Sequence, residues 1–268
     1  MNKKIKGNGT LIAIGGNEDK LDDMKVLKRI VNESRGRDTK VEVITTASEN
    51  PRLMSDNYEK AFKRLGVHGF GSINISTRTE AADRSLEKRI NEANLIFFTG
   101  GDQLRLSSIL GGSFFLETVH KRFLDGAIIA GTSAGAAALS ETMIYDGEGS
   151  SGLLKGSISM GPGIGFISDL IIDTHFITRS RIGRLFQVVA TNPSILGIGL
   201  CEDTAIMIKK EDIFEVFGSG LVVVVDGGHL KNSNISKINK GEPIAVENFH
   251  VHSLAEGYRY NFGERKFL

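Results

Sequence analysis

The sequence has little cysteine, little net charge and no long apolar run, and each shortage excludes a class of protein. Cys201 is the single cysteine, so the chain can form no intrachain disulfide and no cysteine-based zinc cluster. The formal net charge is +1, whereas proteins that bind nucleic acid or membrane surfaces generally carry a basic excess. No histidine or cysteine pair has metal-ligand spacing. We therefore expect no nucleic-acid partner, no membrane partner and no metal.

The same shortages bear on location and domain organisation. The segment Met1–Lys6 is basic but lacks the apolar stretch of a signal peptide, and no segment approaches the roughly 20 apolar residues of a membrane span. With one cysteine, these features predict a protein of the reducing cytoplasm. The chain also lacks linkers, repeats and low-complexity tracts, so we expect a single domain over residues 1–268.

Short apolar runs alternate with helical patterns through the first half of the chain. Strands are predicted at 11–14, 41–45, 72–76, 94–98 and 127–130, and helices at about 24–31, 57–65, 81–92 and 103–122. This alternation predicts an α/β fold with a mostly parallel sheet flanked by helices. After residue 195 several apolar runs follow one another closely, which predicts extra C-terminal β-structure, partly antiparallel.

The strand at 127–130 leads into Gly131-Thr132-Ser133-Ala134-Gly135, which has the G-x-S-x-G spacing of a nucleophile elbow. Small neighbours permit the sharp turn that exposes a serine hydroxyl, and a helix follows. A Ser N-cap in a tight strand–helix connection is the alternative interpretation. The strand before Ser133 and the alanine-rich helix after it favour the nucleophile.

A serine nucleophile needs a base, and His175 has the best position among the six histidines. It follows the apolar run 170–172, and the carboxyl ends of strands are where an α/β sheet presents catalytic groups to ligands. His68 has the surroundings of a loop residue. His120 lies in a charged helical stretch, where we expect it to be solvated, and the other three lie in turns or edges of the C-terminal region.

Three arginines, Arg179, Arg181 and Arg184, follow His175. Apolar residues recur after residue 181 at helical spacing: Ile182, Leu185, Phe186 and Val189. We expect a helix that buries this stripe and leaves Arg181 and Arg184 on a face away from it, with Arg179 in the preceding loop. Guanidinium groups suit bidentate binding of carboxylates, so we interpret the segment as a binding site rather than a solvated basic face.

The third member of a catalytic triad would be a carboxylate at another strand end. Glu202 and Asp203 both follow the apolar run 198–200, and their positions do not distinguish them. Cys201 lacks the elbow of a nucleophile, and we expect it to be a small core residue.

Four stretches in this order make the chain similar to the cyanophycinase family of serine peptidases, which also includes the aspartyl dipeptidases: FTGGDQ (98–103), GTSAGAA (131–137), DTHFITRSRIGRL (173–185) and GLCEDTA (199–205). The likeness extends from AIGGNED (13–19) to VVVVDGG (222–228). The resemblance implies a flavodoxin-like α/β fold related to class I glutamine amidotransferases, with serine in place of their cysteine. It also implies a homodimer.

The resemblance implies a Ser-His-Glu triad of Ser133, His175 and Glu202, and so selects Glu202 over Asp203. A serine triad requires no cofactor, and we expect neither a metal nor an organic one. The triad acts on a carbonyl whose developing negative charge needs backbone donors.

We expect those donors to be the N–H groups of Gly101 and Ala134. Gly100 and Gly101 end the strand at Phe98, which should neighbour the elbow strand, and glycine permits a close approach. Their nitrogens should therefore face one spot near the Ser133 hydroxyl.

By the same resemblance the substrate is cyanophycin, a polyaspartate with arginine joined through each β-carboxyl, which the family cuts from its end into β-Asp-Arg dipeptides. The matching substrate pocket consists of Gln103, Asp173, Thr174, Arg179, Arg181 and Arg184. Arginines can bind the carboxylates of the polymer, and Asp173 can bind a guanidinium group. The family usually has glutamine just before the catalytic histidine, and the shorter Thr174 cannot make the same reach.

Two alternatives remain. An aspartyl dipeptidase acting on short α-Asp peptides belongs to the same superfamily, and the arginine-rich RSRIGR (179–184) favours the polymer instead. A non-catalytic nucleotide-binding module fits less well, because Gly15-Gly16 forms no G-x-G-x-x-G pattern and the chain has no P-loop lysine.

Overall fold

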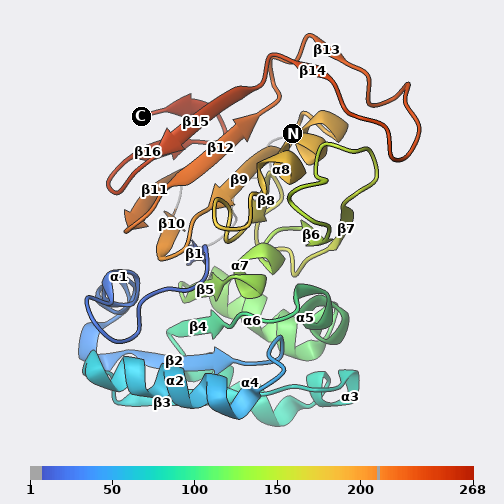
Figure 1. The fold of residues 1–268 in the computed structure, drawn as a ribbon. Coiled ribbons are helices and arrows are strands. Elements are labelled where there is room, and N and C mark those ends of the chain that lie inside the picture. The colour runs from blue at the N-terminus through green and yellow to red at the C-terminus, as the bar shows by residue number, and fades with distance from the viewer. Residues whose placement is uncertain (1–7, 210–211) are drawn as a thin grey trace.

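The computed structural model describes residues 8–209 and 212–268, and the basic segment 1–6 therefore lies outside it. Figure 1 shows a large sheet with helices on both faces and a smaller sheet beside its C-terminal half. In spatial order, the strands of the large sheet are β17 (Lys266–Phe267), β16 (Arg259–Asn261), β11 (Ile213–Gly218), β10 (Thr204–Ile208), β1 (Thr10–Ile14), β5 (Ile128–Thr132), β4 (Leu95–Phe98), β2 (Lys40–Ile44) and β3 (Gly69–Ile73).

The half of this sheet from β1 to β3 is parallel throughout, and β10, β11, β16 and β17 extend it in antiparallel fashion. Every residue of β4 and β5 is buried, as expected for strands covered on both faces. The predicted α/β fold with a mostly parallel sheet flanked by helices is confirmed, including the extra C-terminal β-structure.

From the β3 edge, the parallel strands lie in the order 3-2-4-5-1. Strands β2 to β5 have the relative order of the first four strands in the doubly wound order 2-1-3-4-5. The fifth place, beside β5, is taken by β1, the first strand of the chain. The carboxyl ends of β1 and β5 are consequently neighbours, so the residues after Ile14 lie against those after Thr132.

Helices cover the two faces of the large sheet (Figure 1). On one face α1 (Lys25–Glu33) and α2 (Pro51–Arg64) bury Leu27 and Tyr58 in a shared cluster. The other face carries α3 (Arg78–Ala81), α4 (Glu87–Glu92), α5 (Gln103–Leu110), α6 (Phe114–Leu124) and α7 (Ala134–Ala138). No helix in the described ranges is long and apolar enough to span a membrane.

Two predicted helices are each divided in the structure. The stretch 103–122 is broken between α5 and α6, where Gly112 has a positive φ of 65° and Ser113 accepts a hydrogen bond from Leu116 N–H as a new N-cap. The stretch 81–92 contains a short 3-10 helix at Arg84–Leu86, capped by Asp83, before α4 begins. The strand predicted at 72–76 instead occupies Gly69–Ile73.

The smaller sheet has the order β15 (His250–Leu254), β12 (Val222–Asp226), β9 (Leu196–Leu200) and β8 (Leu170–Asp173), with α8 (Ile182–Thr191) packed on it. Two short antiparallel pairs lie outside both sheets: β6 (Thr142–Asp146) with β7 (Ser159–Pro162), and β13 (Asn232–Ser233) with β14 (Val246–Glu247). One hydrophobic cluster includes Leu11 of the large sheet and Ile198 of the small one. This shared core is consistent with a single domain over 1–268, which stays a prediction.

His120 of α6 is packed rather than solvated, so that expectation is wrong. Its ring stacks on Phe166 with centroids 4.1 Å apart, and its Nε2 lies 2.8 Å from the carbonyl oxygen of Ile164. The half-buried imidazole packs its apolar face against the Phe166 ring. Burial lowers the pKa of His120, and the hydrogen bond to Ile164 only partly opposes this shift.

The lowered pKa predicts an acid-sensitive contribution to stability. A proton binds His120 more readily in the unfolded chain, so its contribution is present above the unfolded pKa of about 6.5 and is lost as the pH falls through the folded pKa. We expect His120→Gln to reduce the loss of unfolding free energy between pH 7.5 and pH 5. Urea denaturation at both pH values measures it. His68→Gln, at an exposed histidine, is the control, and an equal effect of both variants would contradict the assignment.

Candidate active site

Ser133 occupies a strained turn between β5 and α7, with φ 51° and ψ −115°. Such a conformation costs a non-glycine residue about 1–3 kcal/mol and persists only where the surroundings enforce it. The flanking glycines allow the turn to form: a Cβ on Gly131 would lie 2.5 Å from the carbonyl oxygen of Gly135, and one on Gly135 would collide with the carbonyl of Phe98. The sharp strand–turn–helix geometry expected of the G-x-S-x-G segment is therefore present.

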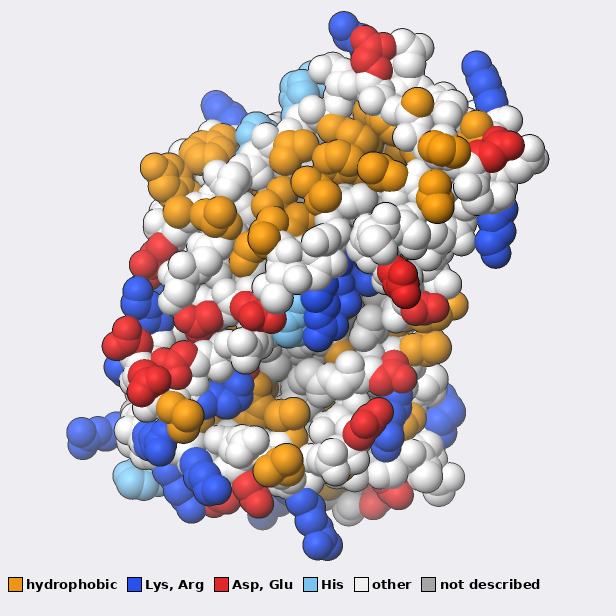
Figure 2. Space-filling view, viewed as in Figure 1, with side chains coloured by type: hydrophobic (Ala, Val, Ile, Leu, Met, Phe, Trp, Pro, Cys, Tyr) orange, Lys and Arg blue, Asp and Glu red, His pale blue; other side chains and the backbone are white. Residues whose placement is uncertain are grey.

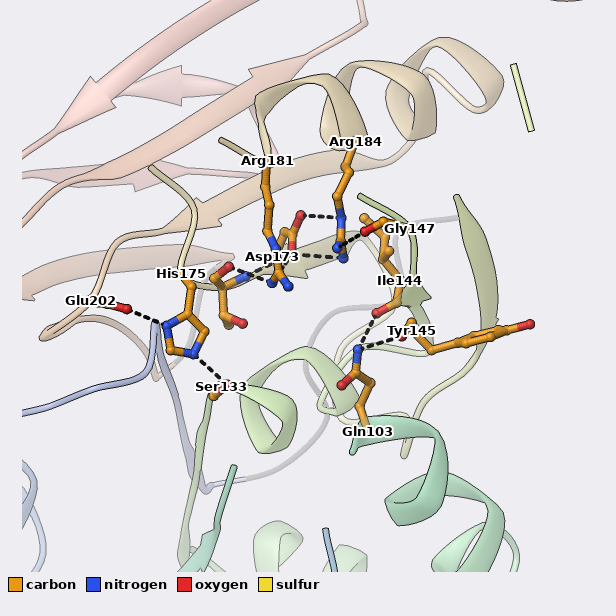
Figure 3. A network of polar contacts seen from close by, with 11 residues as sticks. Gln103, Ser133, Ile144, Tyr145, Gly147, Asp173, His175, Arg181, Arg184 and Glu202 are labelled. Atoms are coloured by element: carbon orange, nitrogen blue, oxygen red, sulfur yellow. Dashed lines mark hydrogen bonds and ion pairs between the residues drawn. The ribbon is translucent and has the colours of Figure 1, made fainter. Parts of the chain in front are cut away.

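Two side chains from other elements complete a hydrogen-bonded chain with Ser133 (Figure 3). His175 follows β8, and its Nε2 lies 2.8 Å from Ser133 Oγ. Its Nδ1 lies 2.7 Å from Oε1 of Glu202, which follows β9. His175 is 9% exposed, so its ring is held by its neighbours while its edge reaches the serine.

Glu202, not Asp203, contacts the histidine. The hydrogen bond from His175 lowers the pKa of Glu202, and a second from Asn17 Nδ2 at 3.2 Å acts in the same direction, so the carboxylate stays ionised. Asp203 has a different role: it accepts hydrogen bonds from the Ser219 hydroxyl at 2.6 Å and the Asp19 N–H at 3.0 Å. An ionised carboxylate at Nδ1 fixes the proton there and leaves Nε2 able to accept the serine proton.

The turn after β1, residues 15–19, connects these elements, and the sequence analysis missed it. Ser133 N–H donates to Ile14 at 3.0 Å, and His175 N–H donates to the Gly15 carbonyl at 2.9 Å. Gly16 has φ 93°, and a Cβ there would lie 2.5 Å from His175 Nε2 and 3.2 Å from Ser133 Cβ. Position 16 must therefore be glycine. Two glycines at a strand end were the available signal, but they were considered only as part of the family resemblance and as a phosphate loop, which fitted less well.

A buried carboxylate, Glu18, lies behind the elbow and was also missed. Its side chain accepts a 2.6 Å hydrogen bond from the hydroxyl of Thr132, the residue before Ser133, and another from the Tyr58 hydroxyl. Burial raises the pKa of Tyr58 well above its usual value, so it keeps the proton that it donates. Lys20 Nζ lies 3.0 Å from Glu18 and supplies the countercharge. Glu18 thus ties the turn after β1 to the end of β5.

Asp173 organises the arginine segment. It is 2% exposed and forms ion pairs with Arg184 at 3.1 Å and Arg181 at 3.2 Å. Burial raises the pKa of Asp173, and the guanidinium charges of Arg184 and Arg181 oppose that shift. Arg181 also donates to the carbonyl of the buried Thr174 at 2.8 Å. The carboxylate predicted to meet a substrate guanidinium is thus already in contact with two from this chain.

The predicted orientation of Arg184 is wrong. Arg184 is 3% exposed and donates to the Gly147 carbonyl, whereas Ile182, predicted to be buried, is 43% exposed. The buried face of α8 therefore differs from the predicted one: it includes Arg184, which forms an ion pair with the buried Asp173, and excludes Ile182. Arg179 lies in the preceding loop as predicted and is exposed, close enough for its charge to help lower the pKa of Glu202.

Gln103, at the start of α5, faces this cluster from the opposite side of the site (Figure 3). Its Nε2 donates to the carbonyls of Ile144 and Tyr145, both at 3.1 Å, which fixes the amide. The space-filling view shows a hollow across this face in which Lys or Arg side chains and a histidine meet (Figure 2). Figure 3 shows Ser133, His175 and Glu202 on one side of Gln103 and the Asp173–arginine cluster.

The Gly100–Gly101 turn lies beside the elbow. A Cβ on Gly100 would be 3.7 Å from Ser133 Oγ, and Gly101, with φ 140°, has no room for a Cβ against the Ala47 carbonyl. Within the described chain, no recorded hydrogen bond occupies the N–H of Gly101 or Ala134. Their role as an oxyanion hole stays a prediction. No cluster of three metal-ligating side chains occurs among the described residues.

Comparison with known proteins gives consistent relatives. The sequence model of peptidase family S51 matches residues 11–216. A cyanophycinase of Geminocystis herdmanii is 33% identical over 94% of this chain and 93% of its own, and one of a Nostoc species is 31% identical over 96% and 87%. A peptidase from an acI-B1 actinobacterium shares the fold, with a TM-score of 0.71 at 20% identity over 96% of this chain and 98% of its own.

Gly16 offers a direct test of this geometry. In Gly16→Ala the new methyl group must displace His175, and a misplacement near 1 Å costs about 100-fold in reactivity. We expect Ser133 to react with a serine-directed phosphonate about 100-fold more slowly, as followed by mass spectrometry. Gly257→Ala is the matched control, because its φ of 85° is similar but nothing lies within 4 Å. Equal rates in the two variants would contradict the packing of Gly16 against His175.

Proposed function

This chain belongs to peptidase family S51 and is a serine peptidase, and from that premise we propose that it hydrolyses cyanophycin to β-Asp-Arg dipeptides. The observation that carries the proposal is the hydrogen-bonded chain Ser133–His175–Glu202 next to a cluster of arginines. The name cyanophycinase, borne by relatives that match nearly the whole chain, supports the substrate.

In the proposed reaction Ser133 Oγ attacks the backbone carbonyl that precedes the terminal β-Asp-Arg unit. His175 Nε2 takes the serine proton, and ionised Glu202 stabilises the resulting imidazolium through Nδ1–H. His175 then gives the proton to the leaving amine. The dipeptide leaves with that new amino group, and an acyl-enzyme remains on Ser133.

Water completes the cycle. His175 takes a proton from a water molecule that attacks the acyl carbonyl, and Ser133 Oγ leaves as the alkoxide and regains the proton. In both steps negative charge develops on the carbonyl oxygen. The N–H groups of Gly101 and Ala134, which no other described group uses, stabilise it as an oxyanion hole.

Charge determines substrate choice in this proposal. Arg179, exposed at the edge of the site, binds a polymer carboxylate, and Arg181, 16% exposed at its side chain, presents a second guanidinium. Asp173 holds Arg181 in place, and the buried Arg184 pairs with the same carboxylate, rather than contacting substrate. Gln103 is fixed through its Nε2, so its amide oxygen can accept from the polymer. Buried Thr174 contributes its position through its backbone carbonyl.

Incubation with purified cyanophycin, β-Asp-Arg and α-Asp dipeptides in parallel tests the function. We expect soluble β-Asp-Arg from the polymer, identified by mass spectrometry, with casein untouched because it lacks the dense charge repeat. Ser133→Ala is the control for a contaminating hydrolase. Turnover of α-Asp dipeptides with intact polymer would make the protein an aspartyl dipeptidase instead. The expected homodimer and cytoplasmic location stay predictions, which light scattering and cell fractionation address.

Substitution of Arg179 and of Arg184 distinguishes an arginine that contacts substrate from one that supports the fold. Arg179→Ala removes an exposed charge, so we expect KM for the polymer to rise about two- to fivefold, with kcat and thermal stability nearly unchanged. Arg184→Ala leaves the buried Asp173 short of a partner and should cost about 3–5 kcal/mol of stability. Steady-state kinetics and urea denaturation measure both. An unchanged KM in Arg179→Ala would remove Arg179 from the substrate site.

A further inference from the structure

A second cavity, of about 690 Å³, opens on the same edge of the large sheet as Ser133 and contains none of the residues discussed so far as catalytic. It lies at the carboxyl ends of β2 and β3 and against the first turns of α2. The residues that matter for its chemistry are Thr45, Glu49, Arg52, Leu53, Asp56 and Asn74.

One loop, residues 45–50, forms both the wall of this cavity and a support of the candidate active site. Its Ala47 carbonyl accepts the N–H of Asp102 at 2.9 Å and packs directly on Gly101. Thr45 and Glu49 of the same loop line the cavity. The two sites are therefore close along the edge: only β4 lies between β5 and β2, whose carboxyl end borders the cavity.

The spacing fits an extended chain. Neighbouring strands lie about 4.8 Å apart, so the cavity is about 10–15 Å from the end of β5. An extended polypeptide covers about 3.3–3.6 Å per residue. A substrate held with its scissile carbonyl at Ser133 reaches the cavity with a unit about three to five residues away.

The cavity is lined by both acidic and basic side chains. Glu49, Arg52 and Asp56 are exposed, and none takes part in an ion pair recorded for residues 8–209 and 212–268. Leu53, 60% exposed, adds an apolar surface on which the methylene stem of an arginine can lie. Such a wall complements a ligand that carries guanidinium and carboxylate groups together.

We propose that this cavity is a second binding site, which holds a β-Asp-Arg unit of the polymer remote from the scissile bond. The carboxylates of Glu49 and Asp56 accept hydrogen bonds from its guanidinium group, and Arg52 binds its carboxylate. The inference rests on the proposed function, since only a polymeric substrate spans both sites. Binding energy at such a remote site raises kcat/KM for long substrates and leaves short ones unaffected.

The test compares long and short substrates in the variant Glu49→Gln/Asp56→Asn. We expect KM for cyanophycin to rise about two- to tenfold, the range for two exposed charge pairs, while KM for a two-unit fragment changes less than twofold. The control Asp38→Asn/Glu87→Gln removes two exposed acids at other places on the surface and should change neither. An unchanged KM for the polymer would overturn the proposal. Equal losses on both substrates would do so too, because they would indicate a disturbed Gly101.

Binding to inactive protein separates this inference from the proposed function. A soluble six-unit fragment is titrated calorimetrically into Ser133→Ala and into Ser133→Ala with both cavity substitutions. We expect weaker binding in the triple variant by the same two- to tenfold factor. If the unsubstituted enzyme cleaves no cyanophycin, the proposed function fails, yet weaker fragment binding in the triple variant still supports the cavity as a site. Equal binding in both proteins overturns it.

Discussion

The turn after β1 is the constraint on which the candidate active site depends. Ile14, Gly15 and Gly16 accept the backbone N–H groups of Ser133, His175 and Asp203, so one short turn sets the positions of three segments from distant parts of the chain. Gly16 has to lack a side chain, because the imidazole occupies that space. The turn is where it is because β1 lies beside β5 in the sheet. Strand order therefore determines how close Ser133 lies to His175.

Strain and buried charge are concentrated at this same edge. Ser133, His175 and Asp203 all have φ near +50°, a conformation that each residue adopts at a cost of about 1–3 kcal/mol. Glu18 and Asp173 are nearly inaccessible carboxylates, and both have cationic and neutral donors around them. In proteins generally, replacing a buried ion pair by apolar residues of similar volume is often neutral or stabilising. These carboxylates instead fix the positions of residues next to the site: Glu18 holds Thr132, and Asp173 holds Arg181.

Sequence reasoning succeeded where the signal is local. The parallel sheet follows from apolar runs of strand length, and the elbow geometry follows from five consecutive small residues. It failed where the partner is distant: Asn17 meets Glu202, 185 positions away, and Thr132 meets Glu18, 114 positions away. It also failed for Arg184, because helical periodicity assigns charged residues outward, whereas the buried Asp173 reverses that preference. Glu202 and Asp203 were distinguishable only by family resemblance, and the structure brings Glu202 to the histidine.

The central claim is that Ser133 and His175 act together in catalysis. The most direct test is the rate at which Ser133→Ala, His175→Ala and the double variant hydrolyse cyanophycin, each variant being confirmed as folded by circular dichroism. If Ser133 and His175 act as one unit, each single substitution removes nearly all catalysis, about 10⁴-fold or more, and the double variant is no slower than the slower single one. Independent contributions would make the losses multiply. A folded double variant that is far slower than either single variant, or a Ser133→Ala protein that retains activity, would contradict the account.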